Sequence, residues 1–80
     1  MQTNNADKHV LNTITKFLMA RGIAENEAQK QAEIKLDGAL PLFHAEFTKA
    51  LAGKANDPRH ILVAVKVATT AVEVWMRANP

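Results

Sequence analysis

The segment from Asp57 to Arg77 constrains the fold more than any other part of the chain, because it is apolar on almost every side when drawn as a helix. Asp57 can accept hydrogen bonds from the free N–H groups of a first helical turn. Pro58 suits the first helical position, where its missing N–H is not needed. The charged residues fall in one narrow arc of the helical wheel, namely Arg59, Lys66, Glu73 and Arg77. This pattern predicts a helix over about residues 58–78.

Two apolar seams run along this predicted helix. The first, spaced 4-3-4-3, consists of Ile61, Val65, Ala68, Val72 and Trp75. The second, spaced 4-3-4, consists of Val63, Val67, Thr70 and Val74. A helix that is apolar nearly all round is either buried or shared between subunits. A chain of 80 residues has few other helices to cover both seams, so we predict that the second seam lies at a subunit or partner interface.

A β-strand is the competing interpretation of the same segment. Ile61, Val63, Val65 and Val67 alternate, and β-branched residues favour strands. However, no Gly, Pro, Asn or Asp lies between Ile61 and Met76 to turn a hairpin, and a single strand of that length would be unusual. The charged arc also fits a period of 3.6 better than a period of 2, which favours the helix.

The preceding residues predict two further helices, over about 5–20 and 25–52. In the first, one face collects Val10, Leu11, Ile14, Phe17 and Leu18, and Gly22 can end it in a Schellman stop. In the second, a single stripe collects Ala28, Ala32, Leu36, Ala39, Leu40, Phe43, Phe47, Ala50 and Leu51. This stripe keeps its phase across Pro41, which lies on the solvent side and can bend a helix. One long helix kinked near Pro41 is favoured, and a complete break near Asp37-Gly38 is the alternative.

The predicted fold is therefore all-α: one helical domain over residues 1–80, built as a small three-helix bundle that dimerises through its C-terminal helix. A core of this size contributes only roughly 3–5 kcal/mol, so self-association would be a natural supplement.

Ile34 and Leu42 lie off the stripe of the second helix. They are either isolated exposed residues or a small patch that faces a partner. Trp75 and Met76 are candidate anchors for a partner, although Trp75 is also in phase with Val72 as a core residue.

No residue pattern in the chain indicates a particular enzymatic reaction. There is no Ser, Cys or Tyr, and the three histidines, His9, His44 and His60, lie on separate predicted helices. No histidine has an acidic neighbour at a spacing typical of a metal site. The glycines are isolated, without the GxGxxG or P-loop spacing that binds phosphates. We therefore expect no catalytic residues, no cofactor and no metal.

A helix-turn-helix around Gly22 is the alternative functional interpretation, in which the chain is a small dimeric DNA-binding regulator. The second helix would present Asn26, Gln29 and Lys30, whose side chains can read base edges. Acidic residues on the same helix, Glu25, Glu27 and Glu33, would carry the wrong sign toward phosphate. Nucleic acid is therefore the less favoured partner.

The first hypothesis is a non-enzymatic interaction module, an inhibitor or adaptor that docks on a protein partner and forms a homodimer. The net charge is +2, with the charges interspersed. The longest apolar run is far too short to span a membrane, and no signal peptide is recognisable, so we expect a cytoplasmic protein without a membrane role. Size and composition are similar to those of small helical proteins of mobile elements, but no motif supports that analogy.

Overall fold

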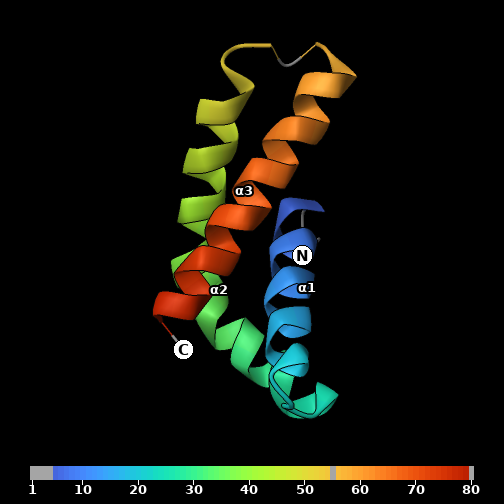
Figure 1. Ribbon diagram of the computed structural model, residues 1–80, viewed down its shortest axis with the longest axis vertical. Coiled ribbons are helices and arrows are strands. Elements are labelled where there is room, and N and C mark those ends of the chain that lie inside the picture. The colour runs from blue at the N-terminus through green and yellow to red at the C-terminus, as the bar shows by residue number, and fades with distance from the viewer. Residues whose placement is uncertain (1–4, 55, 80) are drawn as a thin grey trace.

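Three helices, each antiparallel to the one before it, make up the computed structural model (Figure 1), which describes residues 5–54 and 56–79. They are α1 (Asn5–Ala20), α2 (Glu25–Leu51) and α3 (Pro58–Ala78). No strand occurs within the described ranges, so the prediction of an all-α fold with three helices is confirmed. Figure 1 shows α2 and α3 side by side over most of their length, with the shorter α1 beside the C-terminal half of α3. The thinnest dimension is 19 Å, about two helix diameters.

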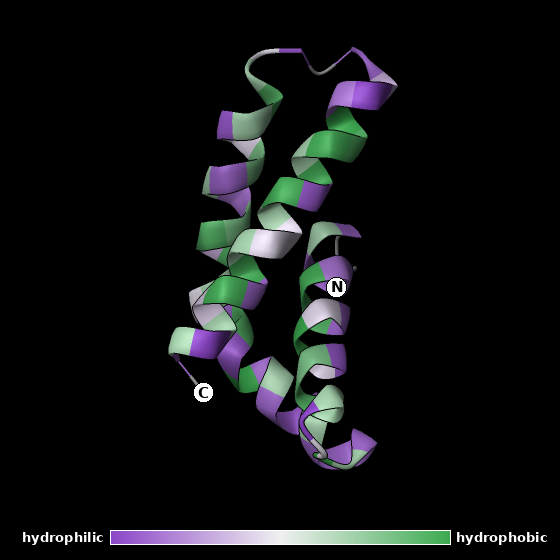
Figure 2. Cartoon of the chain, viewed as in Figure 1, coloured by the Kyte–Doolittle hydropathy of each residue, from purple (hydrophilic) through white to green (hydrophobic). Residues whose placement is uncertain are grey.

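Each helix buries one stripe at the centre of the bundle. In Figure 2 the hydrophobic residues of α1 and α2 gather toward the neighbouring helices. The fully or nearly buried side chains of α1 are Val10, Ile14 and Leu18, and those of α2 are Ala28, Ala32, Ala39 and Phe43. All seven belong to the stripes predicted from the sequence.

The buried line of α3 differs from the predicted first seam. It consists of Ala64, Ala68, Val72 and Met76, whereas Ile61, Val65 and Trp75 are half-buried. The physical reason is that α3 is covered from two sides. Thr69 faces α1, where His9 Nε2 lies 2.7 Å from its Oγ1, and Trp75 faces Gly38 of α2. The most buried line therefore lies between the two contact directions.

The helix α2 runs without interruption through Gly38 and Pro41, so the alternative of a complete break near Asp37-Gly38 is wrong. Gly38 is needed for packing: a Cβ atom built on it would lie 3.0 Å from Cζ2 and 3.2 Å from Cη2 of Trp75. Contacts this short crowd the indole ring, so the missing side chain of Gly38 lets α2 and α3 approach each other. The bend at Pro41 stays a prediction.

Gly22 ends α1 in the predicted Schellman motif. Its φ of 92° lies in the left-handed region, which costs glycine no steric strain. The N–H of Ile23 donates to the Leu18 carbonyl at 3.2 Å, and the N–H of Gly22 donates to the Met19 carbonyl at 2.9 Å, which is the paired bonding of that motif. The chain is thereby turned back toward the core, where Ile23 packs against the buried cluster.

Asp57 begins α3 as the sequence predicts. Its carboxylate accepts from the Arg59 N–H at 2.9 Å, and Pro58 follows at the first helical position. The hydrogen bond from the Arg59 N–H holds the pKa of Asp57 below its ordinary value, and the His60 side chain adds a smaller effect in the same direction. His60 Nδ1 lies 2.9 Å from the other carboxylate oxygen.

We predict that Asp57→Ala lowers stability at neutral pH and that the loss disappears in acid. A carboxyl group whose pKa is lower in the folded chain stabilises the fold above its unfolded pKa, about 3.9 for Asp. That contribution is lost as the pH falls through the folded pKa. Urea unfolding of both proteins between neutral pH and about pH 3 should show the two curves converging below about pH 4. A difference that stays constant across that range would contradict the carboxylate cap.

Candidate functional site

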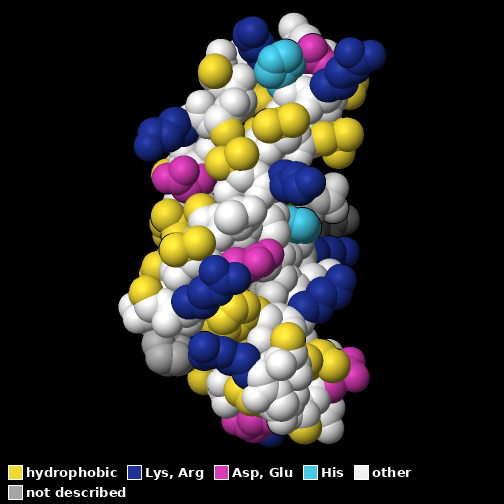
Figure 3. Space-filling view, in the orientation of Figure 1, with side chains coloured by type: hydrophobic (Ala, Val, Ile, Leu, Met, Phe, Trp, Pro, Cys, Tyr) yellow, Lys and Arg dark blue, Asp and Glu magenta, His cyan; other side chains and the backbone are white. Residues whose placement is uncertain are grey.

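The second predicted seam of α3 lies on the surface of the bundle. We call Val63, Val67, Thr70 and Val74 the valine strip. The three valines are 58%, 42% and 54% exposed, respectively, and Thr70 is exposed as well. Figure 3 shows α3 in front, with hydrophobic side chains interspersed with basic and acidic ones. Three branched apolar side chains in one line on a surface helix are the kind of feature that marks an interaction site.

A shallow hollow of about 360 Å³ lies on the strip itself. It is lined by Val63, Lys66, Val67 and Thr70. The Thr70 hydroxyl donates to the Lys66 carbonyl of its own helix at 3.0 Å. Because this hydroxyl already has a partner, covering Thr70 would not leave a buried polar group unsatisfied. The hollow can therefore accept an apolar group.

Charged residues border the strip on one side only. Arg59, Lys66, Glu73 and Arg77 occupy that flank in the helical wheel, whereas the other flank carries His60 and three alanines, of which Ala64 is fully buried. Neither Lys66 nor Glu73 forms an ion pair with another residue that the structure describes. The charged flank therefore carries three basic groups and one acidic group.

The other residues predicted to face a partner have different environments. Ile34 is 78% exposed on α2, and Leu42 is half-buried. Trp75 is half-buried and packs against the core cluster, with its ring beside Gly38. Met76 is fully buried, so the interpretation of Met76 as an anchor for a partner is wrong. It belongs to the line of α3 residues between α1 and α2.

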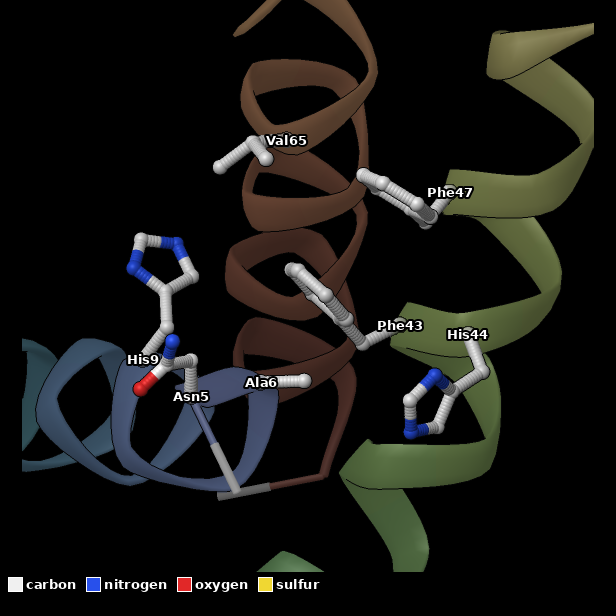
Figure 4. A pocket seen from close by; sticks show the side chains of 7 residues that line it. All are labelled: Asn5, Ala6, His9, Phe43, His44, Phe47 and Val65. Carbon is white, nitrogen blue, oxygen red and sulfur yellow. The ribbon is translucent and has the colours of Figure 1, made fainter. Parts of the chain in front are cut away.

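A second hollow, of about 370 Å³, lies where the three helices meet near the start of α1 (Figure 4). Its lining is mostly apolar and aromatic: Asn5, Ala6, His9, Phe43, His44, Phe47 and Val65. The rings of Phe43 and Phe47 are stacked, with centroids 6.0 Å apart, and His9 and His44 both lie against Phe43. Sequence reasoning missed this convergence, since the two histidines belong to different helices and no local spacing links them.

His9 is held in a defined orientation beside this hollow. The Thr69 hydroxyl donates to the Val65 carbonyl at 2.7 Å, so toward His9 it acts as an acceptor. The short contact between His9 Nε2 and Thr69 Oγ1 then requires a proton on Nε2. This bond links α1 to α3, which makes His9 a packing residue of the bundle.

One histidine has an acidic partner that the expectation from the sequence did not include. Asp57 and His60 are three residues apart and in contact, as described above for the start of α3. Asp57 caps α3 there, and His60 contacts the capping carboxylate. Over the described part of the chain, no three His, Cys, Asp or Glu side chains come together in a group that could hold a metal ion.

The residues proposed to face DNA lie on the first turns of α2. Asn26, Gln29 and Lys30 are all exposed, as readout of base edges would require. The Gln29 amide, however, points to the Glu25 carboxylate at 3.5 Å, and Glu27 and Glu33 are exposed on the same helix. This surface therefore carries at least as much negative as positive charge.

Among the described residues, no helix is both long enough and apolar enough to cross a membrane. Comparison with protein-family models, with curated proteins and with solved structures finds no match to this chain.

Proposed function

We propose that the chain is a non-enzymatic interaction module that forms a homodimer through the valine strip. The observation that carries this proposal is the exposure of Val63, Val67 and Val74 on a single face of α3, while a separate line of α3 residues packs against α1 and α2. Burial of an apolar side chain contributes about 25 cal/mol per Å² removed from water. Covering the strip with a second copy would therefore add stability that a small core lacks.

Within this proposal, the dimer docks on or inhibits a further macromolecule through surfaces outside the strip. Ile34 is the most exposed large hydrophobic residue described, and Leu42 lies farther along the same helix. We also propose that Pro41 bends α2 between these two side chains, because proline removes a backbone donor and crowds the preceding turn. Such a bend would set the shape of the α2 surface.

A DNA-binding regulator is the second candidate, supported by the exposure of Asn26, Gln29 and Lys30 after the Gly22 turn. Phosphate contacts make nucleic-acid affinity fall steeply with salt. Titration with random duplex DNA at low and moderate salt therefore separates the two candidates. Salt-sensitive binding that weakens with Gln29→Ala and Lys30→Ala would favour the regulator, and no binding at low salt would exclude it.

The strip should become protected from solvent when the protein is concentrated. A soluble gadolinium chelate broadens the NMR signals of exposed methyl groups. We expect the Val63, Val67 and Val74 methyl groups to be shielded in concentrated protein and broadened on dilution, because a second copy covers them. Leu62, which is 70% exposed and lies off the strip, is the internal control and should be broadened throughout. Equal broadening of Leu62 and the three valines at all concentrations would contradict the proposal.

A further inference from the structure

We infer that the side of the bundle formed by α1 and α3 binds the phosphate backbone of duplex nucleic acid without reading its sequence. We call Lys8, Lys16, Arg59, Lys66 and Arg77 the basic surface. This inference goes beyond the proposed homodimer, because the basic surface lies outside the valine strip and is complete in a single chain. It also differs from the helix-turn-helix, which would contact DNA through α2.

The fold separates charges that the sequence intersperses. On α1 and α3 as described, every exposed charged side chain is basic, whereas the two acids of these helices, Asp7 and Glu73, are half-buried. On α2 the exposed charged side chains are four acids and two bases, namely Glu25, Glu27, Glu33, Asp37, Lys30 and Lys49. Although the net charge is only +2, one side of the bundle is therefore basic and another is acidic.

The bases of α1 and α3 lie on the same side of the bundle, away from α2. Both helices run antiparallel to α2 and so parallel to each other (Figure 1). On each of them, the bases lie about 120–160° around the helical wheel from the centre of the buried line. Because His9 contacts Thr69, Lys8 and Lys16 lie level with about residues 68 and 76 of α3. The bases thus form two neighbouring rows, and Figure 3 shows Lys and Arg side chains over both helices on this side.

The basic groups are available to an external anion. None of the five forms an ion pair with another residue that the structure describes. On α3, Arg59 and Arg77 are 18 residues apart, so the row on that helix is about 27 Å long. A DNA duplex carries one negative charge per about 1.7 Å of its axis. It therefore offers phosphates along the whole length of such a row.

The side chains between the two rows explain why the sequence of the duplex would not be read. Thr13 and Thr69 line a hollow of about 420 Å³ between α1 and α3, but their hydroxyls already donate to carbonyls of their own helices. Along the described lengths of α1 and α3, no aromatic ring is exposed to stack on unpaired bases. Contact through charge alone is independent of sequence and strongly dependent on salt.

The direction of the basic surface favours a duplex over a membrane. A membrane surface that attracts basic residues also takes up neighbouring apolar ones. In the helical wheel, the bases of α3 lie between the valine strip and the side that faces α1. The basic surface then continues onto α1, which turns it away from the strip. A duplex held by charge alone needs no apolar residue, and so fits this arrangement.

Titration of a labelled random-sequence DNA duplex, followed by fluorescence anisotropy, tests the basic surface. Lys16→Gln and Lys66→Gln should each weaken binding about tenfold at about 50 mM salt and reduce the log–log salt slope by about one, since each removes one phosphate contact. Glu73→Gln removes an acid that lines the same hollow as Lys16, and it should strengthen binding severalfold. Lys30→Gln and Lys49→Gln, which change exposed bases of α2, are the matched controls and should have no comparable effect.

Several results would overturn the inference. Absence of duplex binding at low salt would do so, as would an equal loss for the α2 controls, because net charge and not this surface would then determine binding. Stronger binding to phosphatidylserine vesicles, or to polyglutamate, would replace the duplex by a membrane or by an acidic protein. Loss of binding with Lys30→Gln alone would return the contact to the helix-turn-helix. The mass of the wild-type chain tests the homodimer separately, so either proposal can fail without the other.

Discussion

Replacement of Val67 by Glu should convert the homodimer into a folded monomer. Val67 lies next to the centre of the valine strip and would occur twice in the interface. In one chain its outer part is already exposed, and Glu is a good helix former, so the helix itself should tolerate the change. In the dimer, the two introduced carboxylates would be removed from water without an opposite charge to pair with, which costs several kcal/mol per buried ion. We expect the dissociation constant to rise at least about 100-fold, equivalent to about 2.7 kcal/mol.

The matched control for this experiment is Asn12→Glu, which adds the same charge at an exposed position of α1. Sedimentation equilibrium should give the monomer mass for Val67→Glu and the wild-type mass for the control, with the same helix content for both by circular dichroism. A Val67→Glu protein that remains a dimer would show that the strip is not the interface. A Val67→Glu protein that unfolds would show that Val67 belongs to the core.

Met76→Ala should strongly destabilise the single chain. Met76 is fully buried and belongs to the core cluster. Removing a buried side chain of this size costs about 2–5 kcal/mol, through lost burial and the cavity that remains. For a bundle of this size such a loss is a large part of the total, which for native proteins is roughly 5–15 kcal/mol.

Met19→Ala is the matched control, because Met19 is 42% exposed near the end of α1. Surface substitutions are usually within about 0.5 kcal/mol of neutral. Urea unfolding at a protein concentration low enough to keep both variants monomeric should therefore separate the two clearly. If Met76→Ala were as mild as Met19→Ala, the placement of Met76 in the core would be wrong, and its interpretation as a surface anchor would return.

Local chemistry explains why the helices could be predicted from the sequence. The cap by Asp57, the proline after it and the left-handed Gly22 each act within one turn of chain. Their physical effect does not depend on what packs nearby. Likewise, the apolar stripes of α1 and α2 each have a single covered face, so their period alone indicated the buried residues.

Packing between helices explains what the sequence did not reveal. The most buried residues of α3 depend on the directions from which α1 and α2 approach, which leaves Ile61 and Trp75 half-buried and buries Ala64 and Met76 fully. Likewise, the contact of Gly38 with Trp75 joins residues 37 positions apart. The hollow shared by His9 and His44 also exists only after the helices meet. No local spacing encodes such contacts between distant segments.

The exposure of the valine strip follows from the same geometry. With α1 and α2 covering two adjacent sides of α3, and a thickness of 19 Å, the opposite side of α3 has no third layer to bury Val63, Val67 and Val74. The sequence indicated an exposed second seam because this helix has more apolar faces than the other two helices can cover.

Sedimentation equilibrium of the wild-type chain tests the homodimer most directly. The chain has a mass of 8.8 kDa. If the valine strip joins two copies, the fitted mass should approach twice that value as the protein concentration rises, and it should return toward 8.8 kDa on dilution. A fitted mass that stays at 8.8 kDa up to millimolar concentration would contradict the homodimer and leave the strip without its proposed occupant.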